Sequence, residues 1–237
     1  MSVFLVFAFF VSIILCVILW RHRLRAKREA FIRSFAFPRG LYAQLGKLHP
    51  QLEGKDLALV NHGLRQFFLA YLKSDFKFVA MPSQVADDLW HEFILHTRSY
   101  QQFCEQAFGR FLHHTPAAVL TNNQQVNTGL RRCWRFACEE ENIAPANPVR
   151  LPLLFALDSK LAIVGGFMYT TDCTRLRSQN MQDSGGYASA GYCGTDFSSS
   201  GFDGGTTGLS DGDSGGGDGG SGSDSGCGGG GCGGGGD

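Results

Sequence analysis

Residues 83–104 read SQVADDLWHEFILHTRSYQQFC and contain two helical patterns, one ending at His96 and one starting at Thr97. In the first pattern the apolar side chains recur three and four residues apart, which places them on one face of an α-helix. These apolar side chains are Val85, Ala86, Leu89, Trp90, Phe93 and Ile94. Ser83 is a residue type that often caps a helix N-terminus. The stretch therefore predicts an amphipathic helix over 85–96 whose apolar face packs on a core.

The same periodicity extends to both sides of this stretch. Further helices are predicted over residues 57–71, 97–109 and 126–137. Gly109 is expected to end the second of these helices, because glycine readily adopts the left-handed conformation found at helix ends. Residues 153–157 and 161–164 are two short apolar runs that we expect to form either a small β-hairpin or an irregular strap. We therefore predict a mainly α, compact helical domain over residues 38–183.

The N-terminus is strongly apolar. Residues 3–20 read VFLVFAFFVSIILCVILW and carry no charge. At about 1.5 Å per residue, an eighteen-residue helix reaches about 27 Å, close to the thickness of a bilayer core. A cleaved signal peptide would carry its positive residues before the apolar run, and here they follow it. Residues 1–20 are therefore predicted to be a transmembrane helix that stays in the mature chain.

A basic juxtamembrane segment follows over residues 21–37. Its charged residues are Arg21, Arg23, Arg25, Lys27, Arg28 and Arg33 against the single carboxylate Glu29. Positively charged flanks remain on the cytoplasmic side of a membrane. We therefore expect a single-pass membrane protein whose C-terminal domain is cytoplasmic. In that reducing compartment Cys104, Cys133, Cys138 and Cys173 should be free thiols.

Residues 184–237 form a low-complexity tail rich in Gly, Ser and Asp. Of the 32 glycines, 24 lie in residues 185–237, and this stretch has a charge of −7 against +7 for residues 1–184. Its few apolar side chains cannot offset the entropy cost of folding, so we predict that it is disordered. Because the tail contains no Lys or Arg to contact phosphates, no nucleic-acid partner is expected. Cys227 and Cys232 are either a redox-sensitive pair or a chance occurrence.

The polar face of the 85–96 helix has a possible catalytic or metal-binding arrangement. Asp87 and His91 lie four residues apart, so they are neighbours on one face, and Asp88 lies three residues from His91. A carboxylate beside an imidazole suits either a general base or a metal ligand, and the same pair also occurs as a plain surface ion pair. Leu95 projects into this polar face, which suggests that the face is covered rather than open to water.

His113 and His114 follow shortly after this helix pair. A metal centre would combine His91, one of these two histidines, and Asp87 or Asp88. Two imidazoles with a carboxylate suit zinc or ferrous iron. The alternative is that His113 and His114 lie in a surface loop and that His96 stands at a helix C-terminus, where a cationic ring is favoured.

These motifs resemble the glycine-rich domain-containing protein family. Its D-x-x-W-H core matches Asp87, Trp90 and His91. Bacterial membrane-anchored relatives have W-H-x-F-I-x-x-T-x-x-Y-x-x-F-C and G-R-F-L-H-H, which correspond here to residues 90–104 and 109–114. The positions carried over are Asp87, Trp90, His91, His96, Tyr100, Cys104, His113 and His114. Phe93 and Thr97 depart from the family pattern, where a second His and a Pro are usual. The resemblance covers roughly residues 38–170 and implies a shared domain without a settled reaction.

Two functions follow as hypotheses. The favoured one is a membrane-tethered cytoplasmic interaction or scaffold module that docks an unknown protein partner, because the basic segment and the acidic tail have opposite charges. The alternative is a metal-binding or hydrolase-like module that uses Asp87 and His91, with His113 or His114, as ligands or acid/base groups. Convergence of these side chains within about 4–5 Å separates the second hypothesis from dispersed surface histidines.

Overall fold

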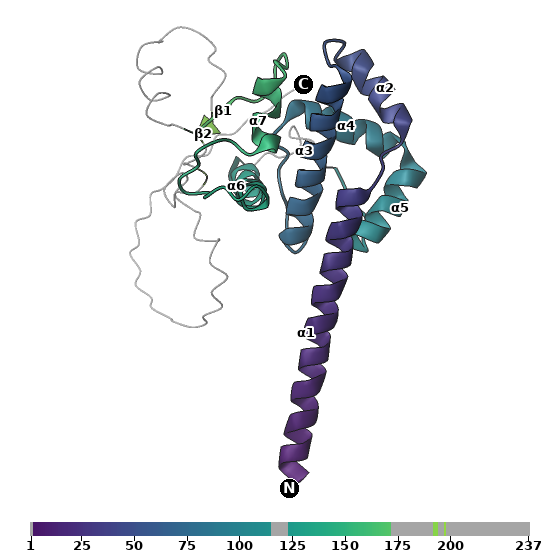
Figure 1. The fold of residues 1–237 in the computed structure, drawn as a ribbon, viewed down its shortest axis with the longest axis vertical. Coiled ribbons are helices and arrows are strands. Elements are labelled where there is room, and N and C mark those ends of the chain that lie inside the picture. Colours follow the sequence, from purple (N-terminus) through teal and green to yellow (C-terminus); the bar gives the residue numbers. More distant parts are fainter. Residues whose placement is uncertain (1, 115–122, 172–191, 194–196, 198–237) are drawn as a thin grey trace, which may run out of the picture. The chain divides into compact units, whose positions relative to one another are not determined.

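A computed structural model of the chain describes residues 2–114, 123–171, 192–193 and 197 (Figure 1). Within these residues the protein is mainly helical, as predicted. The helices are α1 (Ser2–Ser34), α2 (Arg39–Leu48), α3 (Gly54–Lys73), α4 (Gln84–Leu95), α5 (Thr97–Phe108), α6 (Asn123–Glu140) and α7 (Leu153–Lys160). Two short strands, β1 (Tyr169–Thr170) and β2 (Tyr192–Cys193), pair in parallel, with Tyr169 opposite Tyr192. Cys173 lies outside the described residues, and so do all residues of the 184–237 tail except Tyr192, Cys193 and Phe197. These three are ordered, with Tyr192 and Cys193 in β2 and Phe197 buried, so the prediction of disorder does not hold for them and lies outside the described residues for the rest of the tail.

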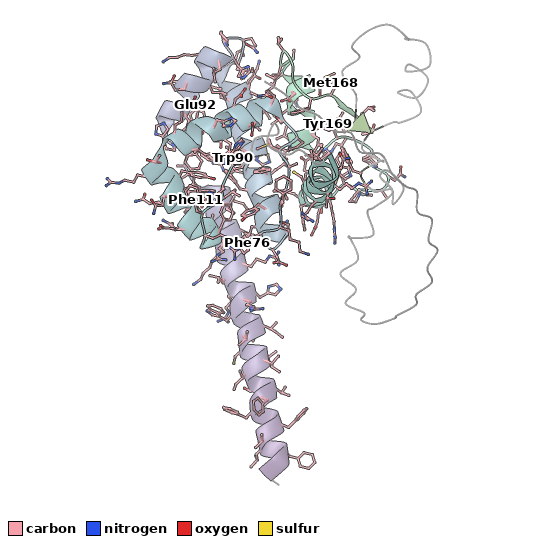
Figure 2. All side chains as sticks on the ribbon, turned by 180° about the vertical axis from the view of Figure 1, so that it is seen from behind. Phe76, Trp90, Glu92, Phe111, Met168 and Tyr169 are labelled. Carbon is pink, nitrogen blue, oxygen red and sulfur yellow. The ribbon has the colours of Figure 1, made fainter. Side chains whose placement is uncertain are left out.

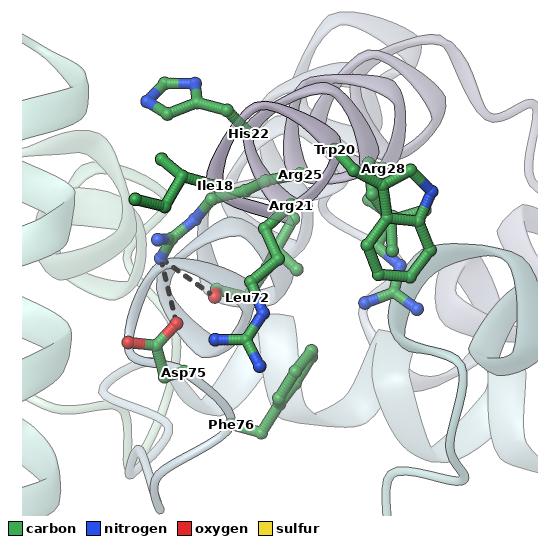
Figure 3. A pocket seen from close by; sticks show the side chains of 10 residues that line it. Ile18, Trp20, Arg21, His22, Arg25, Arg28, Leu72, Asp75 and Phe76 are labelled. Carbon is green, nitrogen blue, oxygen red and sulfur yellow. Dashed lines mark hydrogen bonds and ion pairs between the residues drawn. The ribbon is translucent and has the colours of Figure 1, made fainter. Parts of the chain in front are cut away.

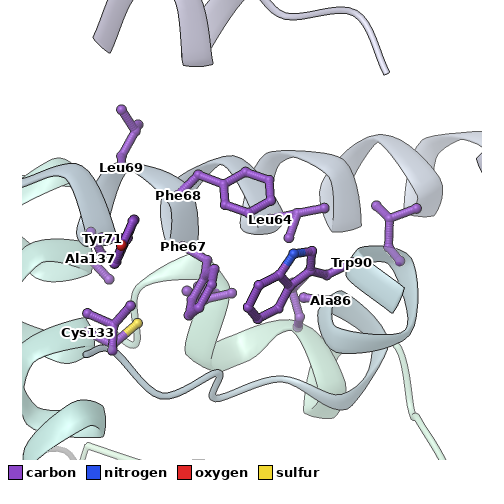
Figure 4. Packing of buried hydrophobic residues seen from close by; sticks show 14 of the residues in the cluster. Leu64, Phe67, Phe68, Leu69, Tyr71, Ala86, Trp90, Cys133 and Ala137 are labelled. Atoms are coloured by element: carbon purple, nitrogen blue, oxygen red, sulfur yellow. The ribbon is translucent and has the colours of Figure 1, made fainter. Parts of the chain in front are cut away.

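Helix α3 is the centre of the helical region. It contacts α1, α4, α6 and α7, and its second half is almost entirely buried. The Phe67 ring packs against Trp90 of α4 with ring centroids 4.9 Å apart (Figure 4). On the α7 side, a Cβ added at Gly63 would come within 2.4 Å of the Leu157 side chain, so glycine at this position lets α3 and α7 pack closely without moving Leu157. The predicted helix over 57–71 is thus confirmed as the main core element.

Helix α1 combines two different environments. Its side chains from Phe4 to Trp20 are exposed (Figure 2), and the helix is long and apolar enough to be a candidate membrane span. The helix does not stop after Trp20 but continues through the basic residues to Ser34. Ile32 is fully buried, and Phe35 packs on Phe103 of α5 with centroids 4.8 Å apart. The basic segment predicted to precede the domain therefore contributes residues to its core.

Helices α4 and α5 follow the sequence prediction closely. The Ala86 N–H donates to Ser83 Oγ at 3.3 Å, so Ser83 is the N-cap of α4. Helix α5 ends at Gly109, which has a φ of 69° in the left-handed region. The predicted apolar face of α4 is buried, with Ile94 partly buried at its edge. These boundaries agree because capping and periodicity act within a few residues.

The prediction for residues 153–164 was wrong. Residues 153–160 form α7, a helix that begins after Pro152, instead of a β-hairpin or a strap. Leu154, Phe155 and Leu157 are buried against the core, where α7 contacts α3 and α4. A short buried apolar run has no periodicity that distinguishes a strand from a helix, so the sequence alone did not decide this element.

Candidate metal centre

The N-terminus of α4, which positions Asp87, is fixed by a buried carboxylate from α7. Asp158 is only 2% exposed. Its Oδ1 accepts hydrogen bonds from Ser83 Oγ at 2.7 Å and from the Val85 N–H at 3.3 Å. Its Oδ2 accepts from the N–H groups of Gln84 at 2.7 Å and Phe167 at 2.9 Å. A negative charge at a helix N-terminus satisfies its free N–H groups and stabilises the helix dipole. Asp158 thus holds the start of α4 and the 167 segment in place.

Sequence reasoning did not identify Asp158 as important. Its partners Ser83, Gln84 and Val85 are 73–75 residues away in the chain. The local signal is a single Asp directly after the buried run 154–157, at a position where a turn residue is equally expected. Only the packing of α7 beside α4 reveals its role.

A hydrogen-bonded chain positions the segment that carries His114. The Trp90 Nε1–H donates to the Tyr100 hydroxyl at 3.2 Å, and this hydroxyl donates to the Leu112 carbonyl oxygen at 2.6 Å. Burial raises the pKa of Tyr100 far above its ordinary value, so the group remains a neutral hydroxyl. Trp90, Tyr100 and Leu112 therefore connect α4, α5 and the segment after Gly109.

This arrangement brings Asp87, His91 and His114 together. The His114 Nε2 lies 3.0 Å from Asp87 Oδ1, and the His91 Nδ1 lies 3.5 Å from Asp87 Oδ2. One potential ligand atom from each residue lies within 4.8 Å of the other two. The two imidazole rings are 4.2 Å apart between centroids, and the edge-on Trp90 ring lies 4.6 Å from His114. The predicted convergence of a carboxylate and two histidines is thus present.

The spacing of these atoms suits a metal ion. With metal–ligand bonds of about 2.1 Å, neighbouring ligand atoms in a tetrahedral site lie about 3.4 Å apart. The His114 Nε2 lies 3.0 Å from Asp87 Oδ1 and the His91 Nδ1 lies 3.5 Å from Asp87 Oδ2, so each imidazole is close to this spacing from one oxygen of the carboxylate. All three ligand atoms lie within 4.8 Å of one another, so a small inward movement of one ring would bring them to coordination distance. His91 is free to make this movement because its side chain is partly open to solvent.

The site is only partly sheltered. The side chain of His114 is 11% exposed and that of Asp87 is 22% exposed, whereas His91 is 49% exposed. The expectation that Leu95 marks a covered face was wrong, since Leu95 is 73% exposed. Helix projection alone does not show whether another element packs over a polar face. Asp87 and His114 are therefore the enclosed members of the cluster, and His91 is the solvent-facing one.

Other predicted candidates lie outside the cluster. Asp88 accepts hydrogen bonds from His49 Nε2 at 2.8 Å and from Gln84 Nε2 at 3.0 Å. Asp88 therefore links the end of α2 to α4 and does not pair with His91. The His113 ring packs on Phe111, with centroids 4.8 Å apart, and is exposed. Of the two candidate carboxylates, Asp87 and Asp88, the structure places Asp87 in the cluster. Of the two candidate histidines, His113 and His114, it places His114 there.

The remaining motif residues are structural in this arrangement. His96 is exposed and lies between α4 and α5, at the end of α4, as the alternative interpretation expected. Cys104 is a fully buried free thiol of α5, and burial raises its pKa. Neither residue is part of the cluster of Asp87, His91 and His114.

An apolar cavity of about 330 Å³ adjoins the cluster. Asp87, Trp90 and His114 lie in its wall, and His113 also lines it. Most of the remaining lining is apolar, with residues that include Phe67, Phe78, Met81, Val126, Leu130 and Phe167. The cavity could not be predicted from the sequence, because its walls come from α3, α4, α6 and three connecting segments that are far apart in the chain. Small, mostly apolar cavities with a few polar groups are typical of ligand sites.

Comparison with known proteins identifies a family. The chain matches the family model UCP032817-like over residues 27–197, and it therefore belongs to this family. The match begins inside α1 and includes all three clustered residues, but it leaves out the apolar N-terminal run and the last part of the tail. No curated protein and no solved structure matches the chain.

Proposed function

We propose that this member of the UCP032817-like family is a membrane-tethered metalloprotein that binds one divalent transition-metal ion through Asp87, His91 and His114. The observation that carries the proposal is the convergence of their three ligand atoms within 4.8 Å. These residues come from two segments that are 27 residues apart and joined by a hydrogen bond between Asp87 and His114. The metal-binding alternative thereby becomes the preferred hypothesis.

The ligand set favours a reactive site over a structural one. Structural zinc sites close all four positions with protein ligands, whereas catalytic sites leave at least one position open. Two histidines and one carboxylate are the ligands of zinc hydrolases and of ferrous oxygenases, in which the open positions take water or substrate. The exposed side of His91 gives water access to the cluster. This combination supports chemistry at a bound water.

The adjoining cavity suggests the class of substrate. Its apolar walls and volume of about 330 Å³ suit a small compound with an apolar or aromatic group. Such a group would lie among Phe67, Phe78 and Phe167, with its reactive end towards Asp87 and His114. A metal-bound water is a stronger nucleophile than free water at neutral pH. Hydrolysis of a small apolar ester or amide is the reaction that this arrangement favours.

The N-terminal half of α1 would tether this site to a membrane. The exposed apolar side chains from Phe4 to Trp20 are consistent with a lipid-embedded helix. By the positive-inside rule, the basic residues that follow would put the helical region on the cytoplasmic side. The resemblance of the motifs at Trp90, Tyr100 and His114 to the glycine-rich domain-containing family would fit a shared helical domain. If the helical domain is shared with that family, the glycine-rich tail would be an addition to this domain.

Metal content of the full-length chain tests the proposal. The protein is purified in detergent, stripped with a chelator, and then loaded separately with Zn²⁺, Fe²⁺ and Mn²⁺. We expect one tightly bound ion per chain. His114→Ala and Asp87→Asn should each reduce metal affinity by about tenfold or more, because each removes one ligand.

The adjacent histidine provides a matched control. His113→Ala removes an imidazole that is exposed and outside the cluster, so its metal content should equal that of the unmodified chain. Equal loss in His113→Ala and His114→Ala would contradict the assignment of the ligand. A folded chain that binds none of the three ions would contradict the metal site itself.

A docking role for the protein is a second candidate, supported by the charges of +7 and −7 on residues 1–184 and 185–237. In this case the acidic tail would compete for the basic segment or extend towards a protein partner. Deletion of residues 185–237 should change the set of recovered partners or the salt dependence of membrane binding. Unchanged behaviour in both experiments would exclude a role for the tail.

A further inference from the structure

A second cavity, of about 510 Å³, lies between α1 and the end of α3 (Figure 3). Its polar walls include three arginines of α1, Arg21, Arg25 and Arg28. Its apolar walls include Trp20 and Phe76. None of the residues that line this cavity belongs to the cluster around Asp87, so it is a separate site.

The arginines of this cavity differ in their partners. The Arg25 guanidinium donates to the carbonyl oxygens of Leu72 at 3.3 Å and Lys73 at 2.6 Å, and it lies 3.5 Å from Asp75 Oδ1. Arg25 is therefore engaged in joining α1 to α3. Among the residues that the structure describes, Asp75 is the one carboxylate that lines the cavity.

Arg21 and Arg28 have no carboxylate partner among the residues that the structure describes. The Arg28 guanidinium lies over the Phe76 ring at 5.9 Å, and its Nε is buried without a hydrogen-bond partner. A buried guanidinium N–H without an acceptor is unfavourable. Among the described residues, the carboxylate of Asp75 is paired with Arg25, so the cavity contains two cationic groups without a carboxylate partner and one unused donor.

The cavity lies where the apolar run of α1 ends and its basic segment begins. Ile18 and Trp20 end the apolar run, and Arg21 starts the basic segment. Trp side chains are enriched at the interface between lipid and water, and Arg near a helix end extends towards the headgroups. If the first half of α1 is embedded, the cavity therefore opens at the level of the lipid headgroups.

We propose that this cavity binds the phosphate group of an anionic phospholipid. The guanidinium groups of Arg21 and Arg28 would donate paired hydrogen bonds to the phosphate oxygens, a geometry that arginine provides and lysine does not. The apolar side chains of Ile18 and Trp20 would contact the start of the acyl chains. This inference depends on the membrane tether proposed above and is independent of the metal centre.

Lipid retention by the full-length chain tests this proposal. Detergent-solubilised protein is exchanged into nanodiscs that contain phosphatidylcholine and phosphatidylglycerol, and after release the bound lipids are counted by native mass spectrometry. We expect one phosphatidylglycerol per chain. The double substitution Arg21→Gln with Arg28→Gln should weaken its retention by about tenfold or more, because it removes both free guanidinium groups.

The control is a second pair on the same helix. Arg23 and Lys27 are exposed and do not line the cavity, so Arg23→Gln with Lys27→Gln removes the same charge from the same segment. This variant should retain the lipid as the unmodified chain does. Equal losses in both double variants would show a general basic surface and overturn the proposal. Arg21→Gln alone is also measured, because exposed Arg21 can change without disturbing the fold.

Inorganic phosphate distinguishes the source of the ligand. In lipid-free detergent, millimolar phosphate should bind weakly and should not displace phosphatidylglycerol. Displacement of the lipid by phosphate, with the same dependence on Arg21 and Arg28, would overturn the assignment to a lipid. The metal content of both double variants should remain unchanged, so a failure of this proposal is distinguishable from a failure of the metal site.

Discussion

Asp87 and His114, which are 27 residues apart in the chain, lie in direct contact, with the imidazole Nε2 3.0 Å from the carboxylate Oδ1. The Trp90 Nε1–H donates to the Tyr100 hydroxyl, and this hydroxyl donates to the Leu112 carbonyl oxygen and so holds the backbone two residues before His114. The Trp and Tyr positions of the motif are therefore positioning residues. Their hydrogen bonds place the second histidine against the first turn of α4.

Replacement of Tyr100 by Phe tests this positioning role. The substitution keeps the ring but removes the hydroxyl that donates to the Leu112 carbonyl oxygen and accepts from Trp90. Because two buried polar groups lose their partner, we expect the free energy of unfolding to fall by about 1–3 kcal/mol. The folded variant should also bind metal more weakly than the unmodified chain. Chemical denaturation and metal titration measure the two effects.

Tyr42→Phe is the matched control for this substitution. The Tyr42 hydroxyl accepts from Asn61 Nδ2 at 2.7 Å, in a contact between α2 and α3 that does not include the metal centre. The control should lose some stability but keep its metal affinity. If both Tyr variants lose affinity equally, Tyr100 does not position His114.

Asp158→Asn should destabilise the protein more than an ordinary surface substitution. Asn keeps the size of the side chain, but an NH₂ group replaces one of the two oxygens. With the NH₂ in place of Oδ2, the N–H groups of Gln84 and Phe167 lose their acceptor, while the amide oxygen still accepts from Ser83. The loss of a buried charge-assisted acceptor predicts a decrease in the free energy of unfolding of about 3 kcal/mol. Chemical denaturation beside Ser159→Ala, at an exposed neighbour, provides the measurement. A loss below about 0.5 kcal/mol, the usual range for surface changes, would contradict the role of Asp158.

Glu140 predicts how stability depends on pH. Burial alone would raise the pKa of its carboxyl group, but hydrogen bonds from Arg33 and Lys73 outweigh burial and hold the pKa below its ordinary value of 4.5. A lowered pKa in the folded state stabilises the protein above pH 4.5, and this contribution is lost as the pH falls through the folded-state pKa. The midpoint temperature of thermal unfolding should therefore decrease when the pH is lowered below 4.5.

Glu140→Gln should lower the midpoint at pH 7 and make the decrease in acid shallower, because Gln cannot ionise. Glu139→Gln is the control, since Glu139 is exposed and its neighbour Glu140 carries the ion pairs to Arg33 and Lys73. Parallel pH curves for Glu140→Gln and the unmodified chain would show that these ion pairs do not contribute to the pH dependence.

The buried cysteines should be chemically inert in the folded chain. Cys104, Cys133 and Cys138 are buried free thiols, and burial raises the pKa of each, for Cys138 to about 12. Because the thiolate is the reactive form, iodoacetamide at pH 8 should leave all three unmodified until the protein is denatured. Peptide mass spectrometry before and after denaturation tests this expectation. Rapid modification of Cys133 in the folded protein would contradict the packing of α6 against the core.

The sequence predicted those parts of the fold that depend on near neighbours. Ser83 at the start of α4 and Gly109 at the end of α5 act within one helical turn, so their roles could be inferred directly. Asp158 could not be identified in this way, because the groups that it accepts from come from α4 and from residue 167. The helical state of residues 153–160 likewise depends on burial against α3 rather than on a local pattern.

The candidate metal centre was likewise predictable only in part. The spacing of Asp87 and His91 on one helix face could be inferred from helical geometry. The choice of His114 over His113 depends on the backbone direction after Leu112, which the Tyr100 hydroxyl fixes. Leu95 gave a wrong indication because exposure of a helix face depends on which elements pack over it.

X-ray absorption of the zinc-loaded, full-length chain tests the central claim most directly, because it identifies the atoms bound to the metal. The account predicts two imidazole nitrogens and one or more oxygen atoms at about 2.0–2.2 Å, with one imidazole lost in His114→Ala and both kept in His113→Ala. A spectrum with sulfur ligands, or one with the same number of imidazoles in both variants, would contradict a site formed by Asp87, His91 and His114.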